Sequence, residues 1–332
     1  MLKLKYLFEN YSLAKECLSF YNYDQESVDD MIRRFRISSN AIYPFRGMQF
    51  FDQICFLRLS PIEEKPISEV VSEVKMINWL IDNGCNVMKP YPMKNGKFVD
   101  IADTIWGKFN VSCFERVPGT DLEHIHGTID IVRGYGECLG KLHQTIKHYP
   151  LQKERRDHKA LLKEIRGRLQ SLGASKLILS ELSDVEKELS KLNIDDNNYG
   201  IVHYDFEPDN VFFDEKNGTY NIIDFDDAIR CWFSLDILRA IDCLDDVVGN
   251  DELSDAKAAF LEGYRKMCVF TKEQADTMPL MKRLVRIQEY STILYVLSEP
   301  VDSEPEWLIG LKHKLSAKLN ALEKSMQYNF SI

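Results

Sequence analysis

Residues 201–230, IVHYDFEPDNVFFDEKNGTYNIIDFDDAIR, decide the fold of this 332-residue chain. They interrupt a long stretch of helical periodicity with short apolar segments, loops and acidic residues. Residues 211–214 and 219–223 have the pattern of two strands, and Asn217 and Gly218 between them tolerate a positive φ. The sequence therefore predicts a β-hairpin inside a helical region. An irregular polar segment of this kind is where a functional site is expected.

The pairing of this hairpin brings an amide and a carboxylate together. If Asp214 pairs with Thr219, Asn210 lies opposite Ile223 and next to Asp224. Opposed residues of an antiparallel pair are about 5 Å apart. Oxygen ligands at that spacing can share a hard cation, and Mg²⁺ prefers a few protein oxygens with phosphate and water completing its shell. The hairpin therefore predicts a magnesium site at its open end.

Asp205 precedes the hairpin in a loop that contains Pro208. A carboxylate there can accept a hydrogen bond from a hydroxyl and orient it for in-line attack. Phosphoryl transfer asks a protein mainly for positioning and charge neutralisation, so the amide and the two acids are nearly a complete minimal set. The alternative is that these aspartates only cap turns in a polar loop. The convergence of several polar residues at one hairpin end argues against it.

Two motifs carry a family resemblance. His203-Tyr204-Asp205 followed by Asn210 resembles the H-x-D-x-x-x-x-N motif of the aminoglycoside phosphotransferase and choline kinase family, and residues 223–226, IDFD, resemble its counterpart of the protein-kinase D-F-G segment. The resemblance implies an α+β, bilobal, protein-kinase-like fold that binds ATP and Mg²⁺. It implies that Asp205 is the catalytic base and that Asn210 and Asp224 hold the magnesium, with Asp226 assisting.

The resemblance also implies an ion pair in the first lobe. Arg58 stands where the family carries a lysine or arginine on a strand, and Glu73 on the following helix resembles its partner. Glu69, one turn earlier, is the rival for that role. A surface arginine on an edge strand is the alternative for Arg58.

Other cofactor-binding residues follow from the same resemblance. Ser39 and Asn40 belong to a turn that would cover the phosphates, although a plain loop fits the same residues. Glu115 and Val117 lie in the linker whose backbone would grip the adenine. Pro118-Gly119 follows and marks a boundary between two lobes. We therefore expect a small β-rich N-terminal lobe, residues 1–117, and a larger, mainly helical C-terminal lobe, residues 118–332.

Three residues near the loop are expected to support it. His203 braces the loop by hydrogen bonding, and Asp236 ties its own helix to the loop. Glu207 departs from the histidine common at this place in the family. It either faces an amine on the acceptor or is a salt-bridge partner for the loop.

Periodicity and turn residues predict the remaining elements. Helical texture is expected over residues 1–30, and Asn95-Gly96 is expected to connect two strands. Further strands are predicted at 41–45, 50–59, 88–92, 98–102 and 112–117, and helices at 67–83, 129–148, 159–172, 177–192, 235–248, 254–267, 271–298 and 307–327.

Composition narrows the class of protein. Hydrophobic residues make up 45% and charged residues 28%, which is typical of an ordered globular chain. A net charge of -10 argues against a duplex nucleic-acid binder. The 8 cysteines form no C-x-x-C pair, so reduced thiols are expected. The start lacks the features of a signal peptide and no apolar run is long enough to span a membrane, so a cytoplasmic protein without membrane partners is expected.

Together these features predict transfer of the ATP γ-phosphoryl group to a hydroxyl of a small molecule. The acceptor would be aminoglycoside-like, amino-alcohol-like or homoserine-like. One alternative is a serine/threonine protein kinase of the bacterial stress-response type, which the acidic run of residues 223–227 also resembles. The other is a nucleotide-binding pseudokinase. The sequence says nothing of oligomeric state.

Overall fold

The computed structural model describes residues 10–37, 40–49, 52–298 and 306–328. These fall into two compact units. The helical unit contains the described residues of 156–194 and 276–332, and the site unit contains those of 10–155 and 195–275. Every described residue of the predicted site lies in the site unit. This grouping runs across residue 117, and a boundary between lobes at that point stays a prediction.

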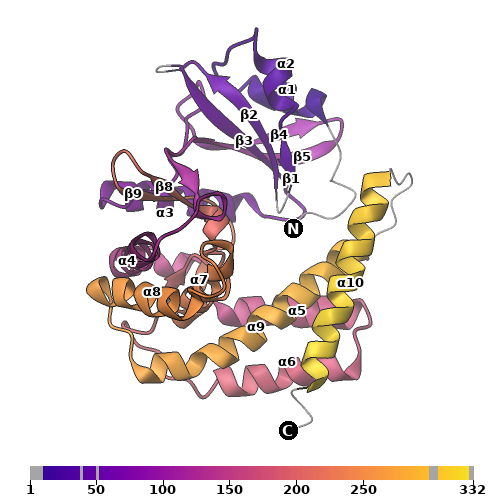
Figure 1. Cartoon of the computed structure of the whole chain (residues 1–332). Helices are drawn as coiled ribbons and strands as arrows, with labels where there is room; N and C mark the ends of the chain where they lie inside the picture. Colours follow the sequence, from indigo (N-terminus) through magenta and orange to yellow (C-terminus); the bar gives the residue numbers. More distant parts are fainter. Residues whose placement is uncertain (1–9, 38–39, 50–51, 299–305, 329–332) are drawn as a thin grey trace. The chain divides into compact units, whose positions relative to one another are not determined.

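An antiparallel sheet forms the first part of the site unit (Figure 1). Its strands, in spatial order, are β1 (Arg36–Ile37), β2 (Ala41–Gly47), β3 (Gln53–Pro61), β5 (Gly107–Glu115) and β4 (Val99–Thr104). In β3 the side chains alternate: Cys55, Leu57 and Leu59 are buried in the core on one face, and Arg58 faces the other way. The strands predicted at 41–45, 50–59, 98–102 and 112–117 correspond to β2, β3, β4 and β5, of which β3 begins at Gln53 and β5 ends at Glu115.

The strand predicted at 88–92 is wrong. Within this segment only Pro90 forms a bridge, with Phe114, and the Tyr91 N–H donates to the Cys113 carbonyl at 2.8 Å. Two of the five residues are prolines, which are depleted in strands. Asn95-Gly96 does form a turn, closed by the Met93 N–H on the Lys97 carbonyl at 2.7 Å, but the strand after it pairs with β5.

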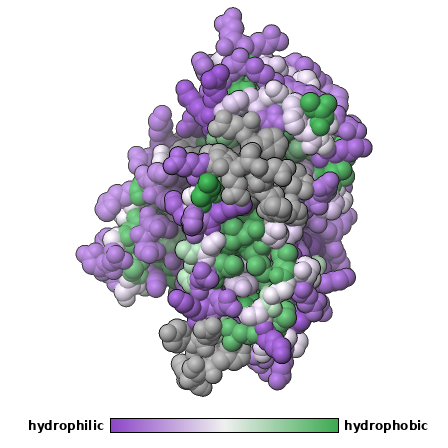
Figure 2. Space-filling model, turned by 90° about the vertical axis from the view of Figure 1, so that its right-hand side faces the viewer, coloured by the Kyte–Doolittle hydropathy of each residue, from purple (hydrophilic) through white to green (hydrophobic). Residues whose placement is uncertain are grey.

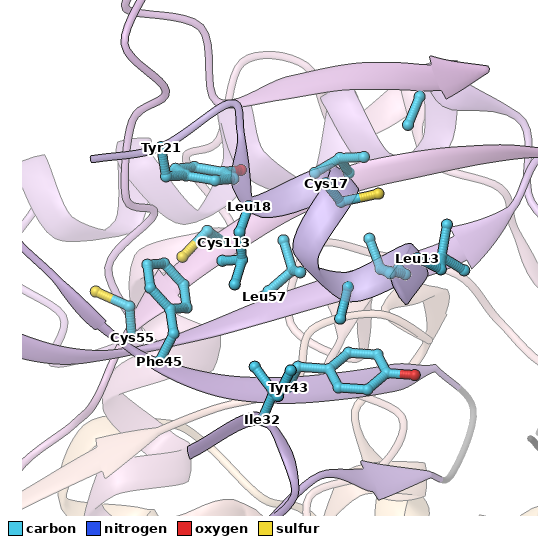
Figure 3. Close-up of a cluster of buried hydrophobic side chains, with 14 of the residues drawn as sticks. Leu13, Cys17, Leu18, Tyr21, Ile32, Tyr43, Phe45, Cys55, Leu57 and Cys113 are labelled. Atoms are coloured by element: carbon cyan, nitrogen blue, oxygen red, sulfur yellow. The ribbon is translucent and has the colours of Figure 1, made fainter. Parts of the chain in front are cut away.

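A hydrophobic core covers one face of the sheet (Figure 3). Helices α1 (Tyr11–Leu18) and α2 (Val28–Ile32) supply its outer layer, and Asn10 caps α1 by accepting from the Leu13 N–H at 2.8 Å. Tyr21 packs its ring against Phe45 at a centroid distance of 5.9 Å. This layer fixes β2 and β3 from behind, so their other face is free to build a site.

Helix α3 (Ile67–Asp82) lies across that other face (Figure 1). Pro66 precedes its first residue, where a missing N–H costs nothing, and Gly84 after its end has a φ of 78°. Val70, Val74 and Ile77 form its buried stripe. The helix thereby presents the buried side chain of Glu73 to Arg58 on β3.

The rest of the site unit surrounds the predicted hairpin. It contains β6 (Thr120–Asp121), α4 (Ile129–Ile146), β7 (Tyr199–Val202), β8 (Val211–Asp214), β9 (Thr219–Ile222), β10 (Ile229–Trp232), α7 (Ser234–Asp242) and α8 (Leu253–Met267). β6, β8 and β9 form one small sheet, and β7 pairs with β10. Within the predicted helix 235–248, α7 ends at Asp242, and a 3-10 turn, Leu244–Asp246, follows.

Helices α4 and α8 approach each other through glycines. A Cβ on Gly136 would lie 2.0 Å from the Phe260 carbonyl oxygen, and one on Gly263 would lie 1.9 Å from the Arg133 carbonyl oxygen. Real Cβ atoms do not come this close to backbone. The two helices therefore pack at a distance that only these glycines allow.

Gly263→Ala should lower the free energy of unfolding by about 3 kcal/mol, because backbone has to move apart to admit the methyl group. Gly167→Ala is the matched control. Gly167 is a helical glycine with open space around its Cβ position, so an alanine there should stabilise by about 0.5–1 kcal/mol. Urea unfolding of both variants measures the difference. Equal stabilities would contradict the close approach of α4 and α8.

The helical unit contains α5 (His158–Ser171), α6 (Lys176–Leu189), most of α9 (Lys272–Leu297) and α10 (Glu306–Tyr328). All four agree with the predicted helices to within a few residues. Arg283 on α9 bonds both carboxylate oxygens of the buried Glu181 on α6, at 2.7 and 2.8 Å. This bidentate ion pair ties the two helices together.

The surface is mostly polar. Figure 2 shows one face of the molecule, where hydrophilic residues cover most of the area and hydrophobic residues gather in the lower half. Ile105, at the turn between β4 and β5, is 90% exposed, and Val269 is 64% exposed. In the described part of the chain, no helix combines the length and the apolar character needed to cross a membrane.

Candidate active site

The hairpin has the predicted register. Asp214 pairs with Thr219 and Val211 with Ile222. One step further, the Ile223 N–H donates to the Asn210 carbonyl at 3.0 Å, so Asn210 and Ile223 lie opposite each other beyond the strands. Asp224 follows directly. The structure thus brings Asn210 and Asp224 to the same open end of the hairpin.

The backbone is strained on both sides of this end. Among the described residues, Tyr204 with a φ of 77° and Asp224 with a φ of 61° are the non-glycine residues in the left-handed region. Such conformations cost free energy and persist where the surroundings hold them, typically at functional sites. Here they reverse the chain just before Asp205 and just after Ile223. One of these residues directly precedes Asp205 and the other is Asp224, so the strain lies at the predicted site.

Asp205 and Asn210 contact each other. A 3-10 turn, Pro208–Asn210, returns the chain, and the buried Asn210 donates from Nδ2 to Asp205 Oδ2 at 3.1 Å and to the Asp205 carbonyl at 3.0 Å. The nitrogen side of the amide is therefore turned to Asp205. Its oxygen, the atom that can bind a metal, is on the other side of the group.

Asp236 fixes the backbone of the loop just before Asp205. Its carboxylate accepts from the backbone N–H groups of His203 at 2.7 Å and Tyr204 at 2.8 Å, and it lies 3.0 Å from His143 Nε2. Asp236 and His143 are fully buried, and burial lowers the pKa of His143. The expected tie between Asp236 and the loop is confirmed, and His143 is part of it.

His203 braces the loop as expected. Its Nε2 lies 2.8 Å from the carbonyl oxygen of Ile223, and its ring packs against Phe225 at a centroid distance of 4.6 Å. The histidine therefore links the loop before the hairpin to the residue in front of Asp224. Its contacts are with backbone and an aromatic ring, which fits a bracing role.

The ionised form of Asp224 lacks a full counter-charge among its neighbours. Burial and then the neighbouring charge of Asp226 raise the pKa of Asp224 to about 7, although Arg58 opposes the shift. An isolated carboxylate in such surroundings is costly to ionise. The position is one where a bound cation would supply the missing counter-charge.

Asp226 has the opposite environment. The Lys65 ammonium contacts its side chain at 2.5 Å and its carbonyl oxygen at 2.7 Å, Arg58 lies 3.5 Å away, and Asn40 also bonds it. Burial by itself would raise the pKa of Asp226, but the charge of Lys65 and then that of Arg58 hold it well below its usual range. Asp226 is therefore an anion balanced by protein cations.

The predicted ion pair forms. Arg58 donates from Nη1 and Nη2 to the two carboxylate oxygens of Glu73, at 2.9 and 2.7 Å, and from Nε to Ser112 Oγ at 3.2 Å. Arg58 is 4% exposed and lies on a central strand, so the alternative of a surface arginine on an edge strand is wrong. Glu69 contributes its carbonyl oxygen to Arg155 and is not the partner.

The linker and the covering turn are described in part. The Glu115 N–H donates to the Lys89 carbonyl at 2.8 Å, and in the described residues no backbone carbonyl accepts from the N–H of Val117. Asn40 is buried at the start of β2 and reaches Asp226. Ser39 lies outside the described residues.

A comparison with known families decides the class of protein. The model of the phosphotransferase enzyme family matches residues 54–272, which is well over half of the chain. The chain belongs to this family. The match includes the hairpin, the loop before it and the strand that carries Arg58.

Curated relatives of this phosphotransferase are small-molecule kinases. Amicoumacin kinase of Bacillus subtilis (strain 168) is 24% identical over 237 residues, which cover 70% of this chain and 68% of the relative. Homoserine kinase of Rhizobium meliloti (strain 1021) is 25% identical over 213 residues, which cover 60% of this chain and 58% of the relative.

Solved structures share the fold of this phosphotransferase. An amicoumacin kinase in complex with AMP-PNP and Ca²⁺ superimposes with a TM-score of 0.78 at 19% identity, covering 97% of this chain and 94% of the other. The microcompartment-associated aminopropanol kinase gives 0.67 at 18% identity, covering 96% and 98%. The predicted α+β, protein-kinase-like fold is confirmed, and the family match confirms that the protein is a phosphotransferase.

Sequence reasoning missed two basic residues of this phosphotransferase. Lys65 lies in the break between β3 and α3, and nothing in the sequence connects it with Asp226. Arg239 on α7 contacts Asp205 and lies 2.9 Å from Glu207 Oε1. It lies one helical turn after Asp236, a spacing that puts both on one face. That spacing was the available signal for Arg239.

Glu207 is a salt-bridge partner of Arg239, one of the two roles considered for it. Burial raises the pKa of Glu207 to about 7, Arg239 opposes the shift, and the charges of Asp205 and Asp209 add to it. The loop therefore carries more acidic groups than its one contacting arginine balances.

Asp236→Ala should lower the free energy of unfolding by about 3–5 kcal/mol, because it leaves two loop amides and His143 buried without their acceptor. Asp130→Ala is the matched control. Asp130 is an exposed partner of Arg133 on α4, and its loss should cost at most about 1 kcal/mol. Urea denaturation compares the two. Equal losses would show that Asp236 does not hold the loop.

Proposed function

We propose that this phosphotransferase moves the γ-phosphoryl group of ATP, bound with Mg²⁺ at Asn210 and Asp224, to a hydroxyl that Asp205 orients. The observation that carries the proposal is the hairpin register. It brings Asn210 beside Asp224 and leaves Asn210 Nδ2 only 3.1 Å from Asp205 Oδ2. Metal ligands and orienting base are then neighbours, as in-line transfer requires.

The residues present fit a divalent metal ion. Asn210 turns its amide oxygen away from Asp205, and Asp224 is a half-buried carboxylate whose pKa is raised for lack of a counter-charge. One amide oxygen and one carboxylate are the small protein share that Mg²⁺ accepts beside phosphate and water. When bound, the ion would neutralise negative charge on the phosphate oxygens. The amicoumacin kinase structure holds Ca²⁺ and a nucleotide analogue, which supports a divalent ion in this fold.

Asp205 acts in this proposal by orientation. Its carboxylate is held on one oxygen by Asn210 and stays an acceptor. An acceptor hydroxyl that donates to it is aimed at the γ-phosphorus. Its proton passes to the carboxylate as the new P–O bond forms, and the bond between the γ-phosphorus and the bridging oxygen breaks to release ADP. Because the transition state is loose, aim and charge matter more than a strong base.

We assign the nucleotide to the part of the site that β3, α3 and the residues before β2 form. Arg58, fixed by Glu73, is a buried cation 3.5 Å from Asp226, its charge also acts on Asp224, and Asn40 joins the same cluster. A guanidinium held in this way can neutralise phosphate oxygens without losing side-chain entropy on binding. The backbones of Glu115 and Val117 are assigned to the adenine. Ser39 keeps its predicted place in the covering turn.

The acceptor is assigned to the amine-bearing alcohols. Asp205, Glu207 and Asp209 stand within five residues of one loop, and the contacting Arg239 bridges only the first two, so carboxylates crowd this side of the loop. A cationic acceptor would relieve that crowding. Relatives are named for amicoumacin, homoserine, aminopropanol and spectinomycin. We assign the same class, an aminoglycoside-like, amino-alcohol-like or homoserine-like hydroxyl compound, to this chain.

A panel of acceptors tests the assignment. Amicoumacin, spectinomycin, streptomycin, homoserine, 1-amino-2-propanol and a generic protein are offered with labelled ATP and Mg²⁺. We expect acceptor-dependent ADP release and a labelled product with at least one of the small molecules. Label entering the protein alone would favour a protein kinase. Nucleotide binding without turnover of any acceptor or of water would favour a pseudokinase.

Asp205→Asn should lower kcat by about 10²–10⁴-fold and leave the affinity for Mg²⁺ and AMP-PNP near that of the wild type, since Asp205 orients the acceptor. Asp224→Asn should instead weaken binding of Mg²⁺ with AMP-PNP by about 10–100-fold. Titration calorimetry measures binding, and ADP release measures turnover. An Asp205→Asn variant with unchanged kcat would reject the base assignment.

A further inference from the structure

Two side chains on the same face of helix α7 contact residues 203–207, the loop that contains Asp205 and is called the catalytic loop below. Asp236 accepts from the loop backbone, and Arg239, one turn later, reaches the side chains of Asp205 and Glu207. Residues three apart on a helix are neighbours. The helix that fixes the loop backbone therefore also decides where the Asp205 carboxylate points.

Arg239 and Asn210 bond different carboxylate oxygens of Asp205. Its Nη2 donates to Asp205 Oδ1, whereas Asn210 Nδ2 donates to Oδ2. A carboxylate bonded on both oxygens has little freedom to rotate. Each oxygen retains a further lone-pair direction, so an acceptor hydroxyl can still donate to it.

Arg239 also separates two acids. The same Nη2 lies 2.9 Å from Glu207 Oε1, so one guanidinium nitrogen bridges Asp205 and Glu207. Without it the two carboxylates face each other unscreened in a half-buried site and repel. The more exposed Asp205 side chain, at 36%, is the one that would turn away.

The Arg239 guanidinium contacts these two carboxylates but leaves one of its own nitrogens without a hydrogen bond among the described residues. Arg239 Nε is buried and finds no hydrogen-bond partner in the part of the chain that the structure describes. A buried donor left unpaired is expensive. An arginine that served the fold alone would be expected to satisfy this donor. The placement favours a role at Asp205.

We propose that Arg239 is a positioning residue for the reaction, which fixes the Asp205 carboxylate toward the acceptor hydroxyl and shields it from Glu207. The inference rests on the proposed function, in which Asp205 orients the acceptor. Arg239 touches the base and acts through it. Its loss therefore misdirects the hydroxyl and leaves the residues assigned to the nucleotide in place.

Kinetics of Arg239→Met, Arg239→Lys and Arg133→Met test this proposal. The assay uses the panel acceptor with the highest kcat/KM, or water if none is turned over. Arg239→Met should lower kcat by about 10–100-fold, the cost of a misplaced reacting group, with the KM for ATP and the melting temperature close to wild type. Arg133 on α4 likewise bridges two carboxylates, Asp130 and Glu262, so Arg133→Met should keep the wild-type kcat.

Rescue separates positioning from a structural role. Arg239→Lys should recover part of kcat, and so should guanidinium ions added to Arg239→Met at concentrations that leave the fold intact. Adding Glu207→Gln to Arg239→Met should also recover activity, because it removes the repulsion on Asp205. A crystal structure of Arg239→Met should show the Asp205 side chain turned from its wild-type direction.

The inference is overturned if Arg239→Met keeps the wild-type kcat. It is also overturned if its loss matches that of Arg133→Met, or if the loss is unchanged by lysine, guanidinium and Glu207→Gln. When Asp205→Asn abolishes transfer in the same assay, such a result removes this inference alone. When Asp205→Asn is fully active, the proposed function fails and this inference with it.

Discussion

The pairing of Val211 with Ile222 fixes where the amide of Asn210 and the carboxylate of Asp224 can lie. A shift of one residue would send both side chains to the opposite face, so the register is the constraint on which the site depends. Asp224 follows Ile223 in the left-handed region of backbone conformation, at the same end of the hairpin as Asn210. Local strand pairing thus brings together the residues of the proposed metal site.

A second layer of interactions holds this arrangement in place. Asp236 bonds the backbone of the loop, and Arg239 on the same helix bonds the side chain of Asp205. On the side of the site formed by β3 and α3, Arg58 pairs with Glu73. Charge is distributed unevenly among them. Asp226 is balanced by protein cations, whereas Asp224 is not. This difference separates a structural acid from one suited to a metal ion.

The sequence predicted those features that depend on residues close together in the chain or on a family pattern. The hairpin followed from Asn217-Gly218 and the strand patterns beside it, and the pair of Arg58 with Glu73 followed from a family pattern. Lys65 could not be connected with Asp226, because 161 residues separate them and only the folded chain brings them together. The strand expected at 88–92 is reduced to one bridge at Pro90, and the two prolines in these five residues were the signal against it.

The most direct test of this account is a crystal structure of the protein with AMP-PNP and Mn²⁺, which reports the ion by its anomalous scattering. We expect one anomalous peak within ligand distance of both the Asn210 amide oxygen and the Asp224 carboxylate, against the phosphates of the nucleotide. An ion bound to the phosphates with Asn210 and Asp224 both out of reach would contradict it.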